Sequence, residues 1–268
     1  MRRESLFNRR RMYRLFRGDG RCLVVAMDHG STLDVFPALN DTTRVVDAVI
    51  AGGADAILTT PGIAREFFDH LKSIGLILRV DGWSADAREK PECNLLFSVE
   101  DALRLGADAV ACMGYVGTPL ECQTLGNLAK VAAECHAWGV PLLAEMLAGG
   151  FTNPELRTPE NTRRAARIGA ELGADIIKTE FTGPGGSFQQ VTEHCYRPVL
   201  VLGGSKRDDD RGLLEMVKSA LEAGASGVAI GRNIWGHSDP QALVKALSRL
   251  IHHDGTVDEA LKVLAGGR

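Results

Sequence analysis

One lysine of the chain stands where it could attack a carbonyl carbon. Lys178 closes an apolar run, residues 174–177, that follows a helix-like segment. Its amine would stay protonated in water, where the ordinary pKa is about 10.4, but burial or a neighbouring cation lowers that pKa and makes the amine a nucleophile. We therefore expect Lys178 to form a Schiff base. The alternative is a strand-end lysine that reaches solvent or pairs with Glu180.

Other polar side chains end apolar runs elsewhere in the chain. Asp28 and His29 follow one run, and the Asp28 carboxylate could move protons at a substrate hydroxyl, although an aspartate at this place could also simply close a turn. Glu145 is the leading acid or base beside the lysine, with His29 as a second candidate. The alternative for Glu145 is an ion pair with Lys178 or Lys206. Lys206 is also the cation that we expect to lower the pKa of Lys178.

Two glycine-containing segments follow the last two apolar runs. Gly203, Gly204 and Ser205 precede Lys206 in one of them, and Gly231 and Arg232 form the other. Glycine lets backbone N–H groups approach an oxyanion, and an arginine adds a bidentate clamp. A lone Gly-Gly is more often a turn, but two such segments at neighbouring strand ends predict a phosphate site. The expected ligand is a phosphorylated carbonyl compound.

A repeated phrase shows how these residues are positioned. Gly-Ala-Asp stands between a helical pattern and an apolar run in three places, and related glycines occupy the same place in three more. Such glycines end helices in the left-handed conformation and let the chain enter a strand at once. The copies begin at Gly53, Gly106 and Gly173, with a degenerate copy at Gly224 and single glycines at Gly75 and Gly139.

Eight strands alternating with helices follow from this repeat. Continuous apolar strands between helices indicate a parallel sheet covered by helices, and eight units in 268 residues close into a (β/α)8 TIM barrel. An open doubly wound sheet is the alternative, but it needs no eighth unit. The strands are expected near 22–27, 55–59, 76–80, 108–113, 140–145, 174–178, 198–202 and 227–230. The main helices are expected at 42–51, 99–105, 125–138, 158–172, 213–222 and 240–251.

The barrel separates catalytic from structural positions, because active sites of this fold lie at the carboxyl ends of the strands. Asp55, Asp108 and Asp175 of the repeat stand at the opposite ends, so we expect them to cap strand entries. Residues 1–21 are rich in arginine and should form a basic helical extension packed under the first strand, within a single domain spanning residues 1–268. His252 and His253 are expected on the solvated surface.

Composition excludes several function classes. A net charge of −3 gives no reason to expect a nucleic-acid partner, and no apolar stretch is long enough to span a membrane. The start of the chain lacks the apolar core of a secretory signal, so a cytoplasmic location is expected. The seven histidines show no metal-binding spacing. We therefore expect no metal and no cofactor.

Four blocks in order resemble those of the archaeal-type class I fructose-bisphosphate aldolases. They are residues 25–30, 176–179, 202–206 and 231–235, and the resemblance extends over nearly the whole chain. The group also includes 2-amino-3,7-dideoxy-heptulosonate synthases and the autoinducer-2 phosphate thiolase. The resemblance implies a TIM barrel, Lys178 as the Schiff-base lysine and Asp28 as its acid/base partner. It also implies phosphate held by Gly204, Ser205, Gly231 and Arg232, and homo-oligomers, often decameric rings.

The chain departs from that pattern at one position. The aldolases and synthases carry a tyrosine acid/base in a Met-Tyr-Pro-Arg-Gly stretch, whereas Leu147 stands there in this sequence. Glu145, His29 or Tyr115 must then move the proton, or the reaction differs. We expect a metal-independent aldolase or transaldolase acting on a phosphorylated ketose. The alternatives are acyl transfer from a phosphorylated β-diketone to coenzyme A, since the thiolase also lacks the tyrosine, and a non-catalytic phosphosugar-binding protein.

Overall fold

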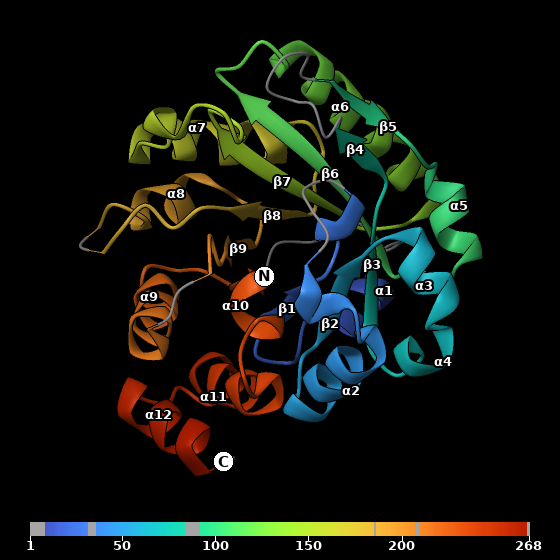
Figure 1. The fold of residues 1–268 in the computed structure, drawn as a ribbon. Coiled ribbons are helices and arrows are strands. Elements are labelled where there is room, and N and C mark those ends of the chain that lie inside the picture. The colour runs from blue at the N-terminus through green and yellow to red at the C-terminus, as the bar shows by residue number, and fades with distance from the viewer. Residues whose placement is uncertain (1–8, 32–35, 84–91, 185, 207–208, 267–268) are drawn as a thin grey trace.

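Eight parallel strands form a closed barrel in the computed structural model, which describes residues 9–31, 36–83, 92–184, 186–206 and 209–266. Figure 1 looks into the ring along its axis. All eight predicted strands are present, so the prediction of a TIM barrel is confirmed. They are β1 (Cys22–Ala26), β2 (Ala56–Thr59), β3 (Gly75–Arg79), β6 (Ala109–Val116), β7 (Leu142–Ala148), β8 (Ile176–Thr179), β9 (Val199–Leu202) and β10 (Gly227–Ile230).

Helices surround the barrel (Figure 1). Their apolar faces pack on the outward-facing strand residues. The six predicted helices are α2 (Thr42–Gly52), α5 (Val99–Arg104), α6 (Glu121–Trp138), α7 (Pro159–Glu171), α9 (Asp210–Glu222) and α11 (Pro240–His252). The structure adds α3 (Pro61–Glu66), α4 (Phe68–Leu71), α8 (Gln189–His194), α10 (Arg232–Trp235) and α12 (Val257–Gly266). Within the described part of the chain, no helix combines the length and apolarity needed to cross a bilayer.

Local capping explains where these helices begin and end. The Thr158 side chain accepts a hydrogen bond from the Asn161 N–H and starts α7, with Pro159 in its first turn. Five of the six predicted glycines have the left-handed conformation, with φ of 103° at Gly173, for example. Gly75 is the exception, because it is already the first residue of β3. A side chain at Gly75 would meet the carbonyl oxygen of Arg14 at 2.8 Å.

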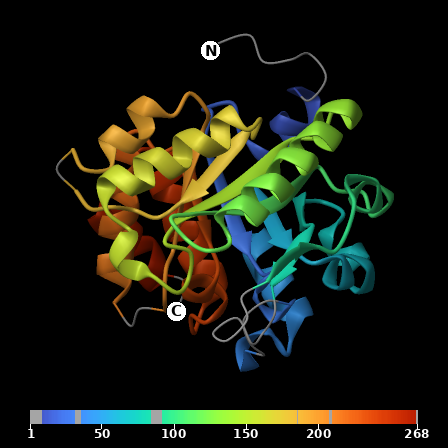
Figure 2. The ribbon, with the colours of Figure 1, turned by 90° about the horizontal axis from the view of Figure 1, so that it is seen from above.

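The N-terminal helix α1 (Arg9–Leu15) lies beyond one end of the barrel, as Figure 2 shows in dark blue. Met12, Leu15 and Phe16 are buried and join the cluster of apolar side chains that fills the barrel interior. The described part of the extension thus packs on the barrel interior, and residues 1–8 lie outside the described residues. Arg14 extends the contact through an ion pair to Asp108, 2.8 Å away.

The aspartates of the repeat tie neighbouring strands together. Asp55 accepts the backbone N–H of Leu23 at 2.6 Å, and Asp108 accepts that of Leu76 at 3.0 Å. The third aspartate makes the same bond to the first residue of β7. Each carboxylate thus satisfies an N–H at the start of the preceding strand, as their position at the strand entries predicted.

His252 lies at the same end of the barrel as these aspartates, and the prediction that it is on the solvated surface was wrong. Its side chain is 2% exposed, with Nδ1 2.8 Å from an Asp19 oxygen and Nε2 2.9 Å from an Asp55 oxygen. Both partners are distant in the sequence, which is why the spacing of charges along α11 did not reveal them. His253 is exposed, as predicted.

A short antiparallel hairpin departs from the simple alternation. It consists of β4 (Asp81–Trp83) and β5 (Cys93–Leu95) and follows β3 almost directly. Asp81 lies at the carboxyl end of β3, because it follows the last residue of that strand by two positions, and it pairs with Leu95 in the hairpin. That is the end at which the barrel holds its polar side chains.

Candidate active site

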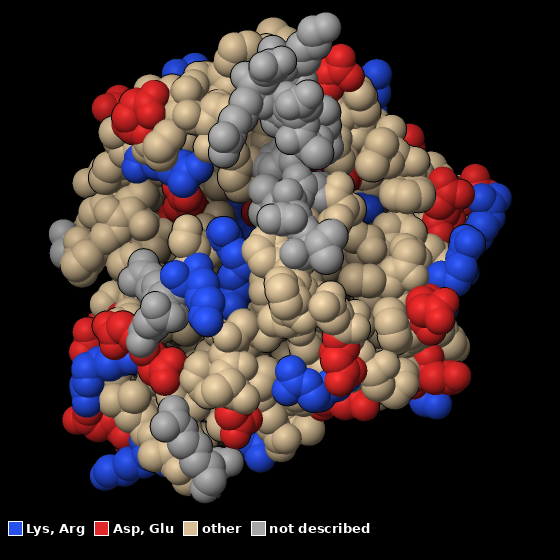
Figure 3. Space-filling view, viewed as in Figure 1, with Lys and Arg blue, Asp and Glu red and all other residues tan. Residues whose placement is uncertain are grey.

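A cavity of about 380 Å³ opens at the carboxyl ends of the barrel strands. Figure 3 shows Lys and Arg side chains gathered at the hollow in the middle of this face, with acidic side chains beside it. Strand alternation explains why the charges point inward, because side chains on one face recur every second residue. The apolar residues Ile77, Leu143 and Ile176 fill the barrel interior. Two residues further on, each of their strands carries a charged residue that lines the cavity: Arg79, Glu145 and Lys178.

Lys178 is buried and does not reach solvent. Its side chain is 6% exposed, and Nζ lies 2.7 Å from Oε1 of Glu145. Glu180, the partner considered in the alternative, instead pairs with Arg157 at 2.8 Å. Of the two lysines considered as partners of Glu145, the structure therefore selects Lys178. The catalytic roles of these residues remain predictions.

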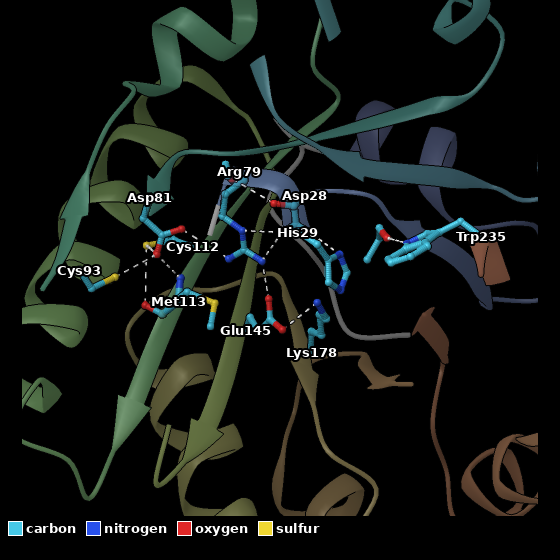
Figure 4. A network of polar contacts seen from close by, with 12 residues as sticks. Asp28, His29, Arg79, Asp81, Cys93, Cys112, Met113, Glu145, Lys178 and Trp235 are labelled. Carbon is cyan, nitrogen blue, oxygen red and sulfur yellow. Dashed lines mark hydrogen bonds and ion pairs between the residues drawn. The ribbon is translucent and has the colours of Figure 1, made fainter. Parts of the chain in front are cut away.

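Arg79 is, with Arg157, a charged residue of the cavity lining that sequence reasoning missed. Its guanidinium lies 2.8 Å from Oδ2 of Asp28 and 3.4 Å from Asp81, and Nη2 donates a short hydrogen bond to Oε2 of Glu145 (Figure 4). Burial disfavours its charge, but the three carboxylates raise the pKa of Arg79. A signal was present in the sequence, because Arg79 ends β3 on the same face as Ile77.

The positive charges of Arg79 and Lys178 keep the carboxylates of Asp28 and Glu145 ionised in spite of burial. Desolvation alone would raise the pKa of Asp28, but the charges of Arg79, Lys178 and His29 outweigh it and hold the pKa at about 2. The pKa of Glu145 is likewise lowered, because Lys178 and Arg79 outweigh the effect of burial. At neutral pH, both groups are therefore ionised.

His29 completes the polar wall beside Asp28. Its Nδ1 lies 3.6 Å from Oδ1 of Asp28, and its ring makes edge contacts with Phe36 and Trp235. Burial lowers its pKa, and the charges of Lys178 and Arg232 lower it further. The ring is therefore neutral at pH 7 and can accept a proton.

The two predicted glycine segments meet at one side of the cavity. Gly203, Gly204, Ser205, Gly231 and Arg232 all line it. The conformation of Gly204, with φ of 67°, favours glycine. A side chain at Gly231 would meet the imidazole of His29 at 2.5 Å, so this glycine lets the histidine approach.

One side chain joins these two segments. The amide of Asn233 donates to the carbonyl oxygens of Gly203, at 2.9 Å, and Ser205, at 3.1 Å. The loop after β9 is thereby fixed to α10, so the spacing between the backbone of the loop and Arg232 is set before a ligand arrives.

Two other predicted residues, Lys206 and Tyr115, lie outside the cavity lining. Lys206 is exposed and is absent from the cavity lining, and its stem passes near Gly236. Arg79, rather than Lys206, is the cation in the same ion-pair network as Lys178. Tyr115 is buried in a small apolar cluster with Leu147, outside the cavity lining, and burial raises its pKa far above the ordinary value. Leu147 itself lines the cavity, where it offers no exchangeable proton.

The fold and the site together define a class of enzyme. A parallel (β/α)8 barrel with a buried lysine at the carboxyl end of a strand has the arrangement of a class I, Schiff-base-forming aldolase. A sequence profile of the DeoC/LacD family aldolases matches residues 22–237. The chain belongs to the DeoC/LacD family of aldolases and is an enzyme of the class I aldolase type.

Curated relatives match along almost their whole length. An uncharacterized aldolase of Saccharolobus solfataricus is 34% identical, over 95% of this chain and 97% of the relative. A 2-amino-3,7-dideoxy-D-threo-hept-6-ulosonate synthase of Halobacterium salinarum is 37% identical, over 91% of each chain. The family resemblance inferred from the four sequence blocks is confirmed.

Solved structures agree with these relatives. An archaeal fructose 1,6-bisphosphate aldolase superposes with a TM-score of 0.84 at 30% identity, covering 92% of this chain and 99% of the other. A Schiff-base-forming fructose-1,6-bisphosphate aldolase, analysed through its reaction intermediates, gives a TM-score of 0.85 at 30% identity, over 92% and 100% of the two chains.

Proposed function

We propose that this class I aldolase acts on a phosphorylated ketose, with Lys178 as the Schiff-base lysine. The observation that carries the proposal is the buried Nζ of Lys178, which lies 2.7 Å from Glu145 inside a cavity that also holds the two glycine segments. Glu145 can take a proton from the lysine ammonium, which frees the amine to attack the ketone carbon. Loss of water then gives the iminium ion.

Carbon–carbon cleavage requires a base at the hydroxyl of the carbon in the β position to the iminium carbon. The Asp28 carboxylate, ionised and held at the end of β1, takes that proton in the proposed mechanism. The hydroxyl carbon becomes an aldehyde, and the electron pair of the broken bond moves to the iminium and forms an enamine. Protonation of the enamine carbon and hydrolysis release the ketone, and the reverse sequence forms the bond. Glu145 and His29 are the candidates to supply and remove these protons.

Phosphate is proposed to bind between the two glycine segments. Arg232 is half-buried at the cavity wall, and the structure gives it no carboxylate partner among the described residues. Arg79 and Arg157, by contrast, are both neutralised by carboxylates. The positive charge of Arg232 is therefore available to bind an anionic group. The backbone N–H groups near Gly204 can bind the same group.

Borohydride trapping tests the proposal directly. Reduction in the presence of dihydroxyacetone phosphate should attach one adduct to Lys178, located by peptide mass spectrometry. Lys178→Met should abolish the adduct, whereas Lys206→Met, which removes an exposed lysine of the neighbouring loop, should retain it. An adduct on another lysine, or none with any phosphorylated ketone tried, would overturn the assignment. We also propose that no metal or other cofactor takes part, so activity should survive EDTA.

Leu147 keeps one alternative reaction open. Because it places an apolar side chain at the cavity wall where the related aldolases carry tyrosine, the same lysine could serve acyl transfer from a phosphorylated β-diketone to coenzyme A. Incubation with both compounds should then yield an acyl thioester. Turnover of a phosphorylated ketose without any thiol acceptor would exclude this branch. A purely binding function predicts instead that Lys178→Met leaves both ligand affinity and biological effect intact.

Assembly and location are also predictions. The proposed state is a cytoplasmic homo-oligomer, up to a decameric ring, as the resemblance to the archaeal-type aldolases implies. Light scattering coupled to size-exclusion chromatography measures the mass of the assembly, and a single species of about 29 kDa, the mass of one chain, would exclude it.

A further inference from the structure

The guanidinium of Arg79 is the central contact of the charged network. It is 5% exposed and meets carboxylates from three different elements: Asp28 after β1, Asp81 in β4 and Glu145 in β7. Figure 4 shows Arg79 between the Asp28 carboxylate on one side and Glu145 on the other, with Lys178 beyond Glu145. A buried arginine with three carboxylate partners keeps their relative positions fixed.

Arg79 is itself held from behind. Asp81 lies 3.4 Å from Nη1 of Arg79, its side chain is fully buried, and it accepts the backbone N–H of Met113 at 2.7 Å. The thiols of Cys93 and Cys112 also donate to its second oxygen, at 3.7 and 3.6 Å. Asp81 therefore connects Arg79 to the backbone of β6, which is part of the rigid barrel wall.

The contacts of Arg79 divide the carboxylate oxygens. It binds Oδ2 of Asp28, and Oδ1 lies on the side of His29. It binds Oε2 of Glu145, and Oε1 faces Lys178. We infer that Arg79 is a positioning residue that holds Asp28 toward the substrate hydroxyl and Glu145 toward the lysine nitrogen. This role rests on the proposed function, but its electrostatic part can be measured in the protein alone.

Arginine suits this task better than lysine. Its planar fork presents several N–H donors in fixed directions, whereas an ammonium is a compact charge on a flexible stem. Without any cation at this position, Asp28 and Glu145 would lose their shared guanidinium partner, and their pKa values would rise as desolvation took effect. A lysine at the position would keep the charge and lose the fixed directions.

Carbon-13 titration of the carboxyl groups separates these two contributions. The Asp28 and Glu145 signals, assigned with Asp28→Asn and Glu145→Gln, are followed against pH in the wild type, Arg79→Lys and Arg79→Met. We expect the midpoints to rise by about one pH unit or more in Arg79→Met and to stay within about half a unit in Arg79→Lys. Arg211→Met, which removes an exposed arginine of α9, is the matched control and should leave both midpoints in place.

Kinetics with a phosphorylated ketose then report on positioning. For Arg79→Lys we expect kcat to fall about tenfold or more while KM changes less than about threefold, because binding is retained and only alignment is lost. The kcat of Arg79→Met should be at least tenfold lower than that of Arg79→Lys.

Two results would overturn the inference. One is unchanged carboxyl midpoints in Arg79→Met, with activity lost only in proportion to unfolded protein. The other is a kcat of Arg79→Lys equal to that of the wild type. The titration needs no substrate, so an enzyme that fails to trap any ketone would refute the proposed reaction without affecting this measurement. If Arg79→Met does not fold, Arg79→Gln takes its place.

Discussion

Glu145 and Lys178 are directly paired residues of adjacent parallel strands, and this register places Oε1 of Glu145 2.7 Å from Nζ of Lys178. Both side chains point into the barrel, because paired residues of neighbouring strands direct their side chains to the same face of the sheet. The proposed acid/base group and the proposed nucleophile are therefore aligned by backbone hydrogen bonds rather than by a flexible loop. Such sites hold their geometry more accurately than sites built on loops.

Substitution of Glu145 tests whether it carries a proton or only pairs with the lysine. In Glu145→Gln, we expect an imine still to form, because water can take the lysine proton in place of the carboxylate. The proton transfers of bond cleavage should slow by about a hundredfold or more, since the amide cannot accept a proton. Single-turnover kinetics with trapping at successive times separates the two steps. Glu215→Gln, on the exposed side of α9, is the control. Normal turnover of Glu145→Gln would make Glu145 a structural partner and leave His29 as the candidate.

His29 should determine the acidic side of the pH profile. Burial lowers its pKa below the ordinary value of about 6.5, so the ring is neutral at pH 7 and takes up a proton only as the pH falls below that value. The carboxyl of Asp28, with a pKa of about 2, titrates far lower. If neutral His29 is the base, kcat/KM declines with a midpoint below pH 6.5, and this decline disappears in His29→Asn. A midpoint that persists in the variant would exclude the histidine.

Arg232 should govern affinity for the phosphate of the substrate. Its loss removes one charge-assisted contact, so Arg232→Met should raise KM for dihydroxyacetone phosphate by about 10- to 100-fold, on the order of 1.5 to 3 kcal/mol. Trapping of unphosphorylated dihydroxyacetone should change little. Arg211→Met provides the control for loss of an arginine at the surface. Equal losses with both ketones would show that Arg232 supports the fold of the site instead.

The Arg157–Glu180 pair should disfavour a second phosphate. Both residues line the cavity, and Glu180 neutralises Arg157 across 2.8 Å. In Glu180→Gln, the guanidinium is left without its counter-charge. The variant should then use glyceraldehyde 3-phosphate more efficiently relative to glyceraldehyde, by about tenfold in the ratio of kcat/KM values. An unchanged ratio would indicate that the pair lies beyond reach of the aldehyde.

The fold was predictable because six of the eight strand entries carry a local signal. A helix-ending glycine, an aspartate and an apolar run recur in sequence, and the structure reproduces all eight strands. The hairpin of β4 and β5 was not predicted, because three-residue strands carry too little periodicity to be recognised. Gly75 was misjudged for a related reason, since a glycine required by close backbone approach reads in sequence like one that ends a helix.

The site was only partly predictable because its network forms between distant residues. Asp28, Glu145 and Lys178 were found by their positions at strand ends, and the structure brings all three to one cavity. Arg79 was missed because an arginine that ends a strand is usually solvated. Only its position two residues after Ile77, on the same face of the strand, indicated that it points into the barrel. Lys206 shows the converse error. It directly follows a loop that lines the cavity, but its own side chain is exposed and lies outside the lining.

The aspartates of the repeat offer a test of structure without chemistry. Asp175 accepts the backbone N–H of Leu142 at 3.0 Å, at the end of the barrel opposite to Lys178. Asp175→Ala removes the acceptor from a buried N–H at the start of β7, so we expect the free energy of unfolding to fall by about 1–3 kcal/mol. Urea unfolding measures this loss, with Asp258→Ala, at an exposed position of α12, as the control.

The same variant should leave the chemistry untouched, because the active site lies at the other ends of the strands. The borohydride adduct on Lys178 should form in Asp175→Ala at the wild-type yield below the unfolding transition. Two outcomes would contradict this division between the two ends of the barrel. One is a loss of stability no larger than that of Asp258→Ala, which would show that another group satisfies the Leu142 N–H. The other is a folded Asp175→Ala protein that no longer forms the adduct, which would place the aspartate in the catalytic machinery.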